Sequence, residues 1–144
     1  IYIFMNYLVA FDGSAGSVAA SEFLKKILTK NDTVVGLFVF YKTDFPAKYD
    51  MFEGEISFDN LENLIYYLRD LFKAIFENFN ERFTYIIPER ISVGSAIIKF
   101  ASEEKMDIIV TGTRKLKGFE KLIMGSVSQS IISESSIPVL VVPP

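Results

Sequence analysis

The chain has 144 residues, of which 50% are hydrophobic and 15% aromatic, and its net charge at pH 7 is −3. A chain of this length buries about two thirds of its unfolded surface in one core, so we expect residues 1–144 to form a single domain. The negative charge disfavours a general nucleic-acid binder, and the longest apolar run, broken at Asn6 and Asp12, is too short to span a membrane. We therefore expect a soluble, cytoplasmic protein that binds neither nucleic acid nor membrane.

Cysteine and histidine are both absent from the sequence. Their absence excludes disulfides, thiolate nucleophiles, zinc–cysteine sites and the commonest general base. The usual hydrolytic triads cannot be built, so we assign no catalytic residue and favour a protein without enzymatic turnover. Any bound metal would be a hard ion with oxygen ligands, such as Mg²⁺.

The first part of the chain predicts two strands joined by a helix. Residues 1–4 precede a methionine suited to a natural start, and we treat them as upstream or added sequence. The apolar runs 7–11 and 33–40 predict buried strands. Between them, Asp12-Gly13-Ser14 predicts a turn, and its serine or Ser17 can cap a helix that reaches about Leu28.

Residues 41–56 show no regular period and contain Pro46 and Gly54, so we predict a loop. Its aromatic side chains either pack against the body of the protein or close over a ligand or partner. The following segment, from about Ser57 to Asn80, has apolar residues at helical spacing and is the clearest predicted helix.

The rest of the chain continues this alternation of strands and helices. It predicts strands at 83–88, 107–111 and 137–142, a helix capped by Ser92 and a helix over about 125–133. Five strands alternating with four helices predict a parallel sheet with right-handed crossovers, covered on both faces as a three-layer α/β sandwich.

The stretch from Asp107 to Ser126 combines two features that attract anions. A buried strand ends at Gly112, where the backbone must turn, and the loop after it is basic. The four cations of this loop, among the chain's 15 lysines and arginines, are Arg114, Lys115, Lys117 and Lys121. Gly125 and Ser126 then begin a helix whose N–H groups and dipole also favour an anion, so we predict a phosphate-binding turn.

This stretch resembles the signature of the universal stress protein family: a glycine, two residues, a glycine, nine residues, then glycine and Ser or Thr. Here Gly112 is followed by Thr113 and Arg114, then Lys115, nine residues, and Gly125-Ser126. The spacing is intact, but lysine replaces the second glycine and gives a G-x-x-K variant. In that family the full signature accompanies ATP binding, and members without it often bind no nucleotide, so this chain stands between the two groups.

The resemblance extends from Met5 to Val142 and implies a Rossmann-like sheet with strand order 3-2-1-4-5. In such a sheet a ligand crevice lies at the carboxyl ends of the strands where the order reverses, here between the first and fourth strands. The residues that the resemblance implies for nucleotide binding are Ala10, Phe11, Asp12, Val39, Thr111, Gly112, Thr113, Arg114, Lys115, Gly125, Ser126, Val127 and Ser128.

Several of these residues also have ordinary structural explanations. Asp12 matches a family residue that binds adenosine and is a candidate ligand for Mg²⁺, but carboxylates are common in turns. Val39 is a core residue under either interpretation. The segment 125–128 either presents N–H and hydroxyl groups to phosphate or simply begins a helix. Gly13 and Gly16 do not complete a dinucleotide fingerprint, because Phe11 occupies the position of its first glycine.

The leading functional prediction is a stress-response protein that binds an adenine nucleotide, ATP or AMP, with Mg²⁺ as a candidate companion, and acts as a sensor or regulator. The alternative is a nucleotide-free dimeric interaction module, which Lys115 favours. A third hypothesis is slow ATP hydrolysis, for which Asp12 is the sole candidate base. We also predict a homodimer, because 138–142 forms an apolar sheet edge that needs a cover and because family members often pair there.

Overall fold

The computed structural model describes residues 3–115, 122–123 and 125–144 of the chain. Its main sheet has five strands in the order β5-β2-β1-β6-β9, all paired in parallel. Numbered among themselves along the chain, these strands have the order 3-2-1-4-5, which confirms the prediction. Their bounds are β1 (Asn6–Ala10), β2 (Thr33–Val39), β5 (Asn80–Ile86), β6 (Ile108–Gly112) and β9 (Val139–Val142).

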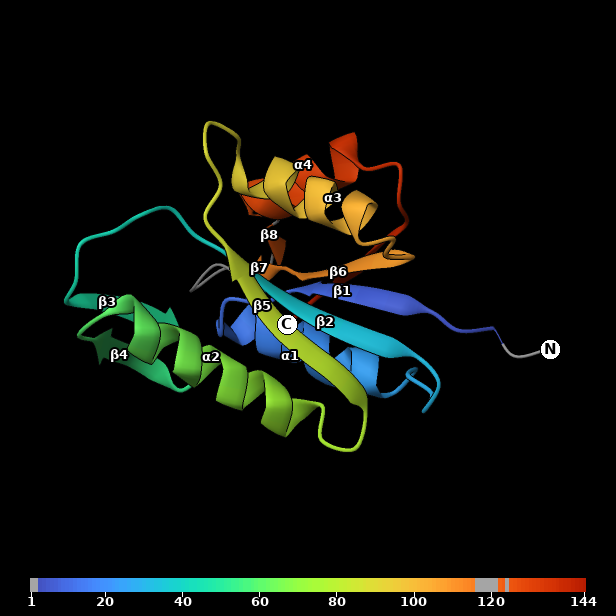
Figure 1. Cartoon of the computed structure of the whole chain (residues 1–144), viewed down its shortest axis with the longest axis horizontal. Coiled ribbons are helices and arrows are strands. Elements are labelled where there is room, and N and C mark those ends of the chain that lie inside the picture. The colour runs from blue at the N-terminus through green and yellow to red at the C-terminus, as the bar shows by residue number, and fades with distance from the viewer. Residues whose placement is uncertain (1–2, 116–121, 124) are drawn as a thin grey trace.

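Helices cover both faces of this sheet, as predicted. The helices α1 (Ala15–Lys25) and α2 (Leu61–Ile75) lie on one face, and α3 (Val93–Glu103) and α4 (Ser126–Glu134) lie on the other (Figure 1). Ser14 caps α1 and Ser92 caps α3, each accepting a hydrogen bond from a backbone N–H three residues later. The result is the expected three-layer α/β sandwich.

The sheet separates two hydrophobic cores, because successive strand residues point to opposite faces. In β1, Tyr7 and Val9 belong to the core shared with α1 and α2, whereas Leu8 belongs to the core shared with α3 and α4. The first core is rich in aromatic rings and centres on Phe72 of α2, which is fully buried against the backbone of Gly36. We call these the aromatic core and the aliphatic core.

The prediction of a loop over 41–56 was wrong for its second half. Two strands, β3 (Ala47–Met51) and β4 (Gly54–Phe58), form an antiparallel hairpin there. In β3 the half-buried Ala47 and Tyr49 alternate with exposed neighbours, so a period of two was present. Gly54 obscured this period in the sequence, because glycine usually marks a turn. Here it begins β4 with a positive φ of 115°, a conformation that glycine adopts readily.

The hairpin packs against both α2 and the turn that follows β1. Met51 and Phe58 are buried in the aromatic core, so this part of the segment lies against the body of the protein. The Phe52 N–H donates a hydrogen bond of 2.8 Å to the carbonyl of Gly13. The Tyr67 hydroxyl of α2 donates to Glu53 at 2.6 Å, and burial together with this bond raises the pKa of Tyr67 to about 12.

Several predicted boundaries were also wrong. The helix α2 begins after its cap, Asn60, because β4 continues to Phe58, and both α1 and α2 end earlier than predicted. The edge strand β5 begins at Asn80, because its backbone pairs with β2 from Thr33 onward although its first residues are polar. At the other edge, β9 begins after Pro138.

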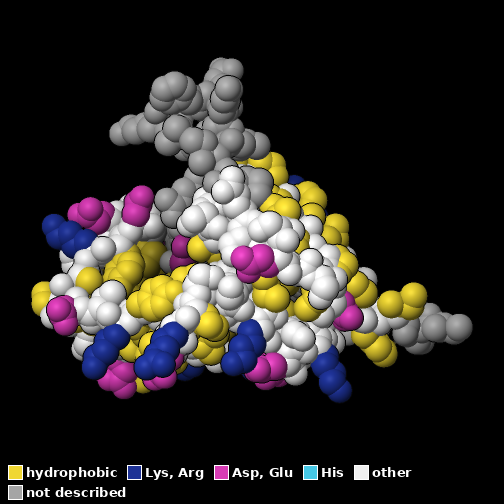
Figure 2. All heavy atoms as spheres, turned by 90° about the horizontal axis from the view of Figure 1, so that it is seen from above, with side chains coloured by type: hydrophobic (Ala, Val, Ile, Leu, Met, Phe, Trp, Pro, Cys, Tyr) yellow, Lys and Arg dark blue, Asp and Glu magenta, His cyan; other side chains and the backbone are white. Residues whose placement is uncertain are grey.

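The surface of the described residues mixes both signs of charge. On the face seen in Figure 2, Lys and Arg side chains alternate with Asp and Glu side chains along one edge. Lys48 and Glu55 form an ion pair at 3.7 Å that bridges the two hairpin strands. None of the helices described is both long enough and apolar enough to cross a membrane.

Candidate functional site

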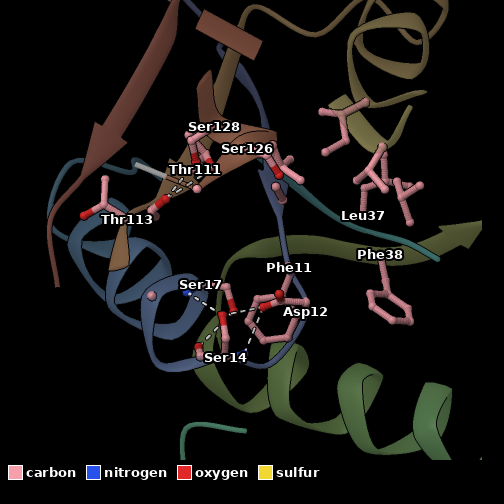
Figure 3. A pocket seen from close by; sticks show the side chains of 18 residues that line it. Phe11, Asp12, Ser14, Ser17, Leu37, Phe38, Thr111, Thr113, Ser126 and Ser128 are labelled. Carbon is pink, nitrogen blue, oxygen red and sulfur yellow. Dashed lines mark hydrogen bonds between the residues drawn. The ribbon is translucent and has the colours of Figure 1, made fainter. Parts of the chain in front are cut away.

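A cleft opens at the carboxyl ends of β1, β2 and β6, where the strand order reverses (Figure 3). It brings together all of the predicted site residues whose side chains are described. These are Ala10, Phe11, Asp12, Val39, Thr111, Gly112, Thr113, Gly125, Ser126, Val127 and Ser128. Figure 3 shows Asp12, Ser14 and Ser17 gathered on one side of the cleft, Thr111, Ser126 and Ser128 on a second, and Leu37 on a third.

One wall of the cleft is apolar. Ala10 and Val39 pack with the aliphatic core, beside Leu37 of β2 and Val93 and Ile97 of α3. The small side chain of Ala10 leaves space between these larger neighbours. This wall suits a flat apolar group, because pockets for small ligands are lined mainly by hydrophobic side chains.

Phe11 contributes to the cleft differently. Its ring is 1% exposed and packs edge-on against Phe72, with ring centroids 5.2 Å apart, in the aromatic core on the other face of the sheet. Its backbone N–H donates to the carbonyl of Leu37 at 2.9 Å. Phe11 therefore holds β1 against β2 at the cleft and presents mainly its backbone there.

The turn after β1 places an exposed carboxylate at the edge of the cleft. Asp12 Oδ1 accepts hydrogen bonds from both the N–H, at 3.0 Å, and the hydroxyl of Ser14. Ser14 Oγ in turn accepts from the N–H of Ser17 and caps α1, and Gly13 supplies the positive φ of 78° that the turn requires. Asp12 thus has the structural role foreseen for a turn carboxylate and still lines the cleft.

The opposite wall is polar, and its buried hydroxyl groups are already hydrogen-bonded. Ser128 is 5% exposed; its hydroxyl donates to the Gly112 carbonyl at 3.0 Å and lies 3.0 Å from the hydroxyl of Thr111. These bonds fasten the first turn of α4 to the end of β6. Among the predicted hydroxyl donors, Ser126 is the exposed one.

The N-terminus of α4 faces this cleft without a side-chain cap. Gly125 is the capping residue, and because glycine has no side chain it accepts no capping hydrogen bond from the first N–H groups of α4. The helix starts as predicted, and its first N–H groups carry the partial positive charge typical of helix N-termini. The geometry suits an anionic group beside Gly125, Ser126 and Val127.

A close backbone contact brings α1 against the end of β6. A Cβ atom added to Gly112 would lie 2.2 Å from the carbonyl oxygen of Gly16, and one added to Gly16 would lie 2.7 Å from that of Thr113. No side chain fits at either position without moving backbone. This contact fixes the floor of the cleft between the Asp12 turn and β6.

The basic loop lies largely outside the described residues. The backbone of Arg114 and Lys115 forms the short strand β7 (Arg114–Lys115), which pairs antiparallel with β8 (Leu122–Ile123). Their side chains, and residues 116–121 with Lys117 and Lys121, lie outside the described residues. The predicted phosphate contacts of this loop therefore stay predictions.

The residues described contain no group of three or more acidic, His or Cys side chains that would hold a metal by themselves. Among the described residues that line the cleft, Asp12 is the one that supplies a carboxylate, and one of its oxygens already binds Ser14. Mg²⁺ is commonly held by one or two carboxylates together with substrate phosphates. The site therefore fits a magnesium ion that arrives with a phosphorylated ligand.

The model of the universal stress protein family matches residues 4–143, nearly the whole chain. The chain belongs to the universal stress protein family. A relative from Staphylococcus haemolyticus that carries the universal stress protein name is 28% identical over 143 residues, which cover 96% of this chain and 84% of the relative.

Solved universal stress proteins share this fold. A protein of this family from Arabidopsis thaliana, solved with AMP bound, has a TM-score of 0.64 at 16% identity, covering 96% of this chain and 91% of that protein. A universal stress protein from Archaeoglobus fulgidus in complex with dAMP has a TM-score of 0.61 at 13% identity, covering 98% of each chain. At these low sequence identities, the structural similarity establishes the fold alone.

The sequence prediction missed several residues of the cleft. Leu37 stands two positions before Val39 in one strand, so it shares the same face, and Val93 and Ile97 stand four positions apart on a helix. Both spacings are visible in the sequence. Gly16 had no comparable signal, because its role depends on how closely α1 approaches β6.

Proposed function

We propose that this universal stress protein binds an adenine nucleotide in the cleft and acts in the cytoplasm as a stress-response sensor or regulator. The observation that carries the proposal is the pairing of an apolar wall with an uncapped helix N-terminus at the point where the strand order reverses. A nucleotide needs both, because its base is flat and largely apolar whereas its phosphates are anionic. The AMP and dAMP held by two proteins of the same fold support it.

In this proposal the base lies against Leu37, Val39 and Val93, and the phosphates lie at the first turn of α4. The ribose then lies near Asp12, whose Oδ1 is held by Ser14. The other carboxylate oxygen forms no hydrogen bond within the described residues and accepts from a ribose hydroxyl or binds Mg²⁺ between itself and the phosphates. ATP, ADP and AMP share the base and ribose contacts and differ in the number of phosphate groups that they bring to α4.

Calorimetric titration with AMP, ADP and ATP, each with and without Mg²⁺, tests this function. We expect measurable binding of at least one of them, and we expect Asp12→Asn to weaken it about fivefold, since a charged hydrogen bond is replaced by a neutral one. Asn retains an acceptor for Ser14, so the turn survives. Asp70→Asn, on the exposed side of α2, is the matched control and leaves affinity unchanged. Absence of heat at high micromolar protein for all three nucleotides contradicts the proposal.

Replacement of Lys115 decides how the variant signature works. A glycine at this position of the family signature lets backbone N–H groups approach phosphate, whereas the lysine ammonium offers charge-assisted hydrogen bonds of about 1.5–3 kcal/mol each. We expect both Lys115→Gly and Lys115→Ala to weaken ATP binding, with the smaller loss for glycine, and we expect the parent's affinity to fall more steeply with added salt than that of the variants.

The opposite result for Lys115→Gly supports the second candidate function. If this variant gains affinity that the parent lacks, the lysine blocks the site. The protein is then a nucleotide-free interaction module of the same fold, the alternative that the replaced glycine favours.

The predicted homodimer is proposed to form along β9. This strand is an edge of the sheet, and a groove beside it is lined by Leu140, Val141, Pro143 and the partly exposed Phe23 of α1. An apolar edge of this kind favours pairing with a second strand. A second copy of the chain can supply that strand through a two-fold axis.

Light scattering at micromolar concentration is expected to return twice the mass of the chain. Val141→Lys places a charge on the paired edge and is expected to yield a monomer, whereas Tyr66→Lys, on the exposed side of α2, is expected to leave the dimer intact. A monomeric parent protein contradicts this assembly.

A further inference from the structure

The two helices on the aliphatic face each contribute to one wall of the cleft. Val93 and Ile97 of α3 belong to the apolar wall, and Gly125 to Ser128 at the start of α4 form the polar wall. The helices lie side by side on this face of the sheet (Figure 1). The spacing between α3 and α4 therefore sets the distance between the α3 part of the apolar wall and the polar wall.

The helices pack closely at a glycine next to the apolar wall. A Cβ atom added to Gly94 would lie 2.6 Å from Ser130 Oγ and 2.8 Å from Ser130 Cβ, with the Val127 carbonyl oxygen 3.5 Å away. Carbon atoms that are not bonded do not approach so closely, so no side chain at position 94 is compatible with the present spacing. Gly94 directly follows Val93, and Ser130 lies one turn after Val127, so the contact lies immediately behind the walls.

A second link holds the same turn of α3. The Ser95 hydroxyl donates to Glu134 at the end of α4 at 3.3 Å. The Ser92 hydroxyl donates to Ser95 Oγ at 2.9 Å and accepts from the Ser95 N–H at 3.1 Å. The first turn of α3 is therefore joined to α4 by close packing at Gly94 and by hydrogen bonds at Ser95.

We propose that the Gly94–Ser130 contact sets the width of the cleft and thereby adjusts it to ligands that touch both walls at once. The inference rests on the proposed nucleotide-binding function. Gly94 and Ser130 are positioning residues, because neither lines the cleft. A ligand with a base and a phosphate depends on the distance between the walls, whereas a ligand without a phosphate depends on it much less.

The experiment compares AMP with adenosine, which lacks the phosphate. Calorimetry is carried out on the parent, Gly94→Ala, Ser130→Gly and the double variant. We expect Gly94→Ala to weaken AMP binding about tenfold and adenosine binding by less than about threefold, because α3 is displaced from the phosphate-binding turn. In the Ser130→Gly background, which removes both Ser130 atoms and leaves only the Val127 carbonyl oxygen at 3.5 Å, Gly94→Ala is expected to have little effect on AMP binding.

The comparison separates this inference from the function on which it rests. A parent protein that binds none of AMP, ADP and ATP removes both. If the parent binds only ADP or ATP, that nucleotide replaces AMP in the comparison with adenosine. A parent that binds its nucleotide and a Gly94→Ala variant that binds it equally well overturn the inference alone. Equal losses of affinity for AMP and adenosine indicate general destabilisation and also overturn the inference. A double variant that binds AMP as weakly as Gly94→Ala alone overturns it as well. Circular dichroism monitors folding. If Gly94→Ala fails to fold, Ser130→Thr places one extra methyl group at the same contact and is subject to the same criteria.

Discussion

Gly112→Ala is expected to destabilise the fold by about 3 kcal/mol or more and to abolish nucleotide binding. The new Cβ would lie 2.2 Å from the carbonyl oxygen of Gly16 and 2.5 Å from its carbonyl carbon. Both atoms belong to the backbone of α1, so no side-chain rotation relieves the contact. Relief requires α1 or the end of β6 to move, and movement of β6 also displaces the Gly112 carbonyl from the Ser128 hydroxyl.

Denaturant unfolding of parent and variant measures the change in the free energy of unfolding, and calorimetry with AMP measures binding. Gly54→Ala is the control, because a Cβ there meets nothing within 4 Å and only the positive φ of 115° is strained. We expect it to cost about 1–2 kcal/mol and to leave AMP binding intact. The proposed role of the α1–β6 contact is wrong if Gly112→Ala proves no more costly than this control.

Phe72→Ala is expected to lower the free energy of unfolding by about 4 kcal/mol. The ring is fully buried, and its centroid lies 5.2 Å from that of Phe11, 4.7 Å from Phe76 and 5.9 Å from Phe83. It also covers Gly36, the position in β2 where the backbone itself faces the core. Its removal leaves a cavity whose surrounding strands and helix cannot collapse fully to fill it.

The matched control for Phe72→Ala is Tyr66→Ala on the same helix, where the ring is 54% exposed. We expect this control to change the free energy of unfolding by less than about 0.5 kcal/mol. Urea unfolding followed by circular dichroism measures both variants. Similar values for the two would show that the aromatic core does not dominate the stability of the sheet and α2.

The strands and helices, and their succession along the chain, were predictable because they depend on short-range patterns. Ser14 and Ser92 mark helix starts by their capping chemistry, and the apolar run in β2 reflects burial on both faces. The order of the strands required the family resemblance, because periodicity does not specify which strands pair. The hairpin is hard to predict because Pro46 and Gly54 interrupt its apolar pattern, although Gly54 begins β4.

The cleft was predicted from strand ends and the family signature, which located Asp12, Thr111 and the start of α4 in one place. What could not be predicted depends on distances between elements remote in sequence. Gly16 approaches β6 and Gly94 approaches α4 because neither has a side chain, but glycine in a sequence does not indicate which neighbour it will meet. The hydrogen bond from the Ser128 hydroxyl to the Gly112 carbonyl likewise depends on how α4 packs against β6.

The hydrogen bond from the Phe52 N–H to the Gly13 carbonyl makes the hairpin an indicator of the state of the cleft. An amide hydrogen exchanges with solvent deuterium only when its hydrogen bond opens. The exchange rate at Phe52 therefore records how often the turn carrying Asp12 separates from the hairpin, at a residue outside the cleft lining. Mass spectrometry of a peptide spanning the hairpin turn thus measures the separation of the Asp12 turn from the hairpin in the unmodified protein.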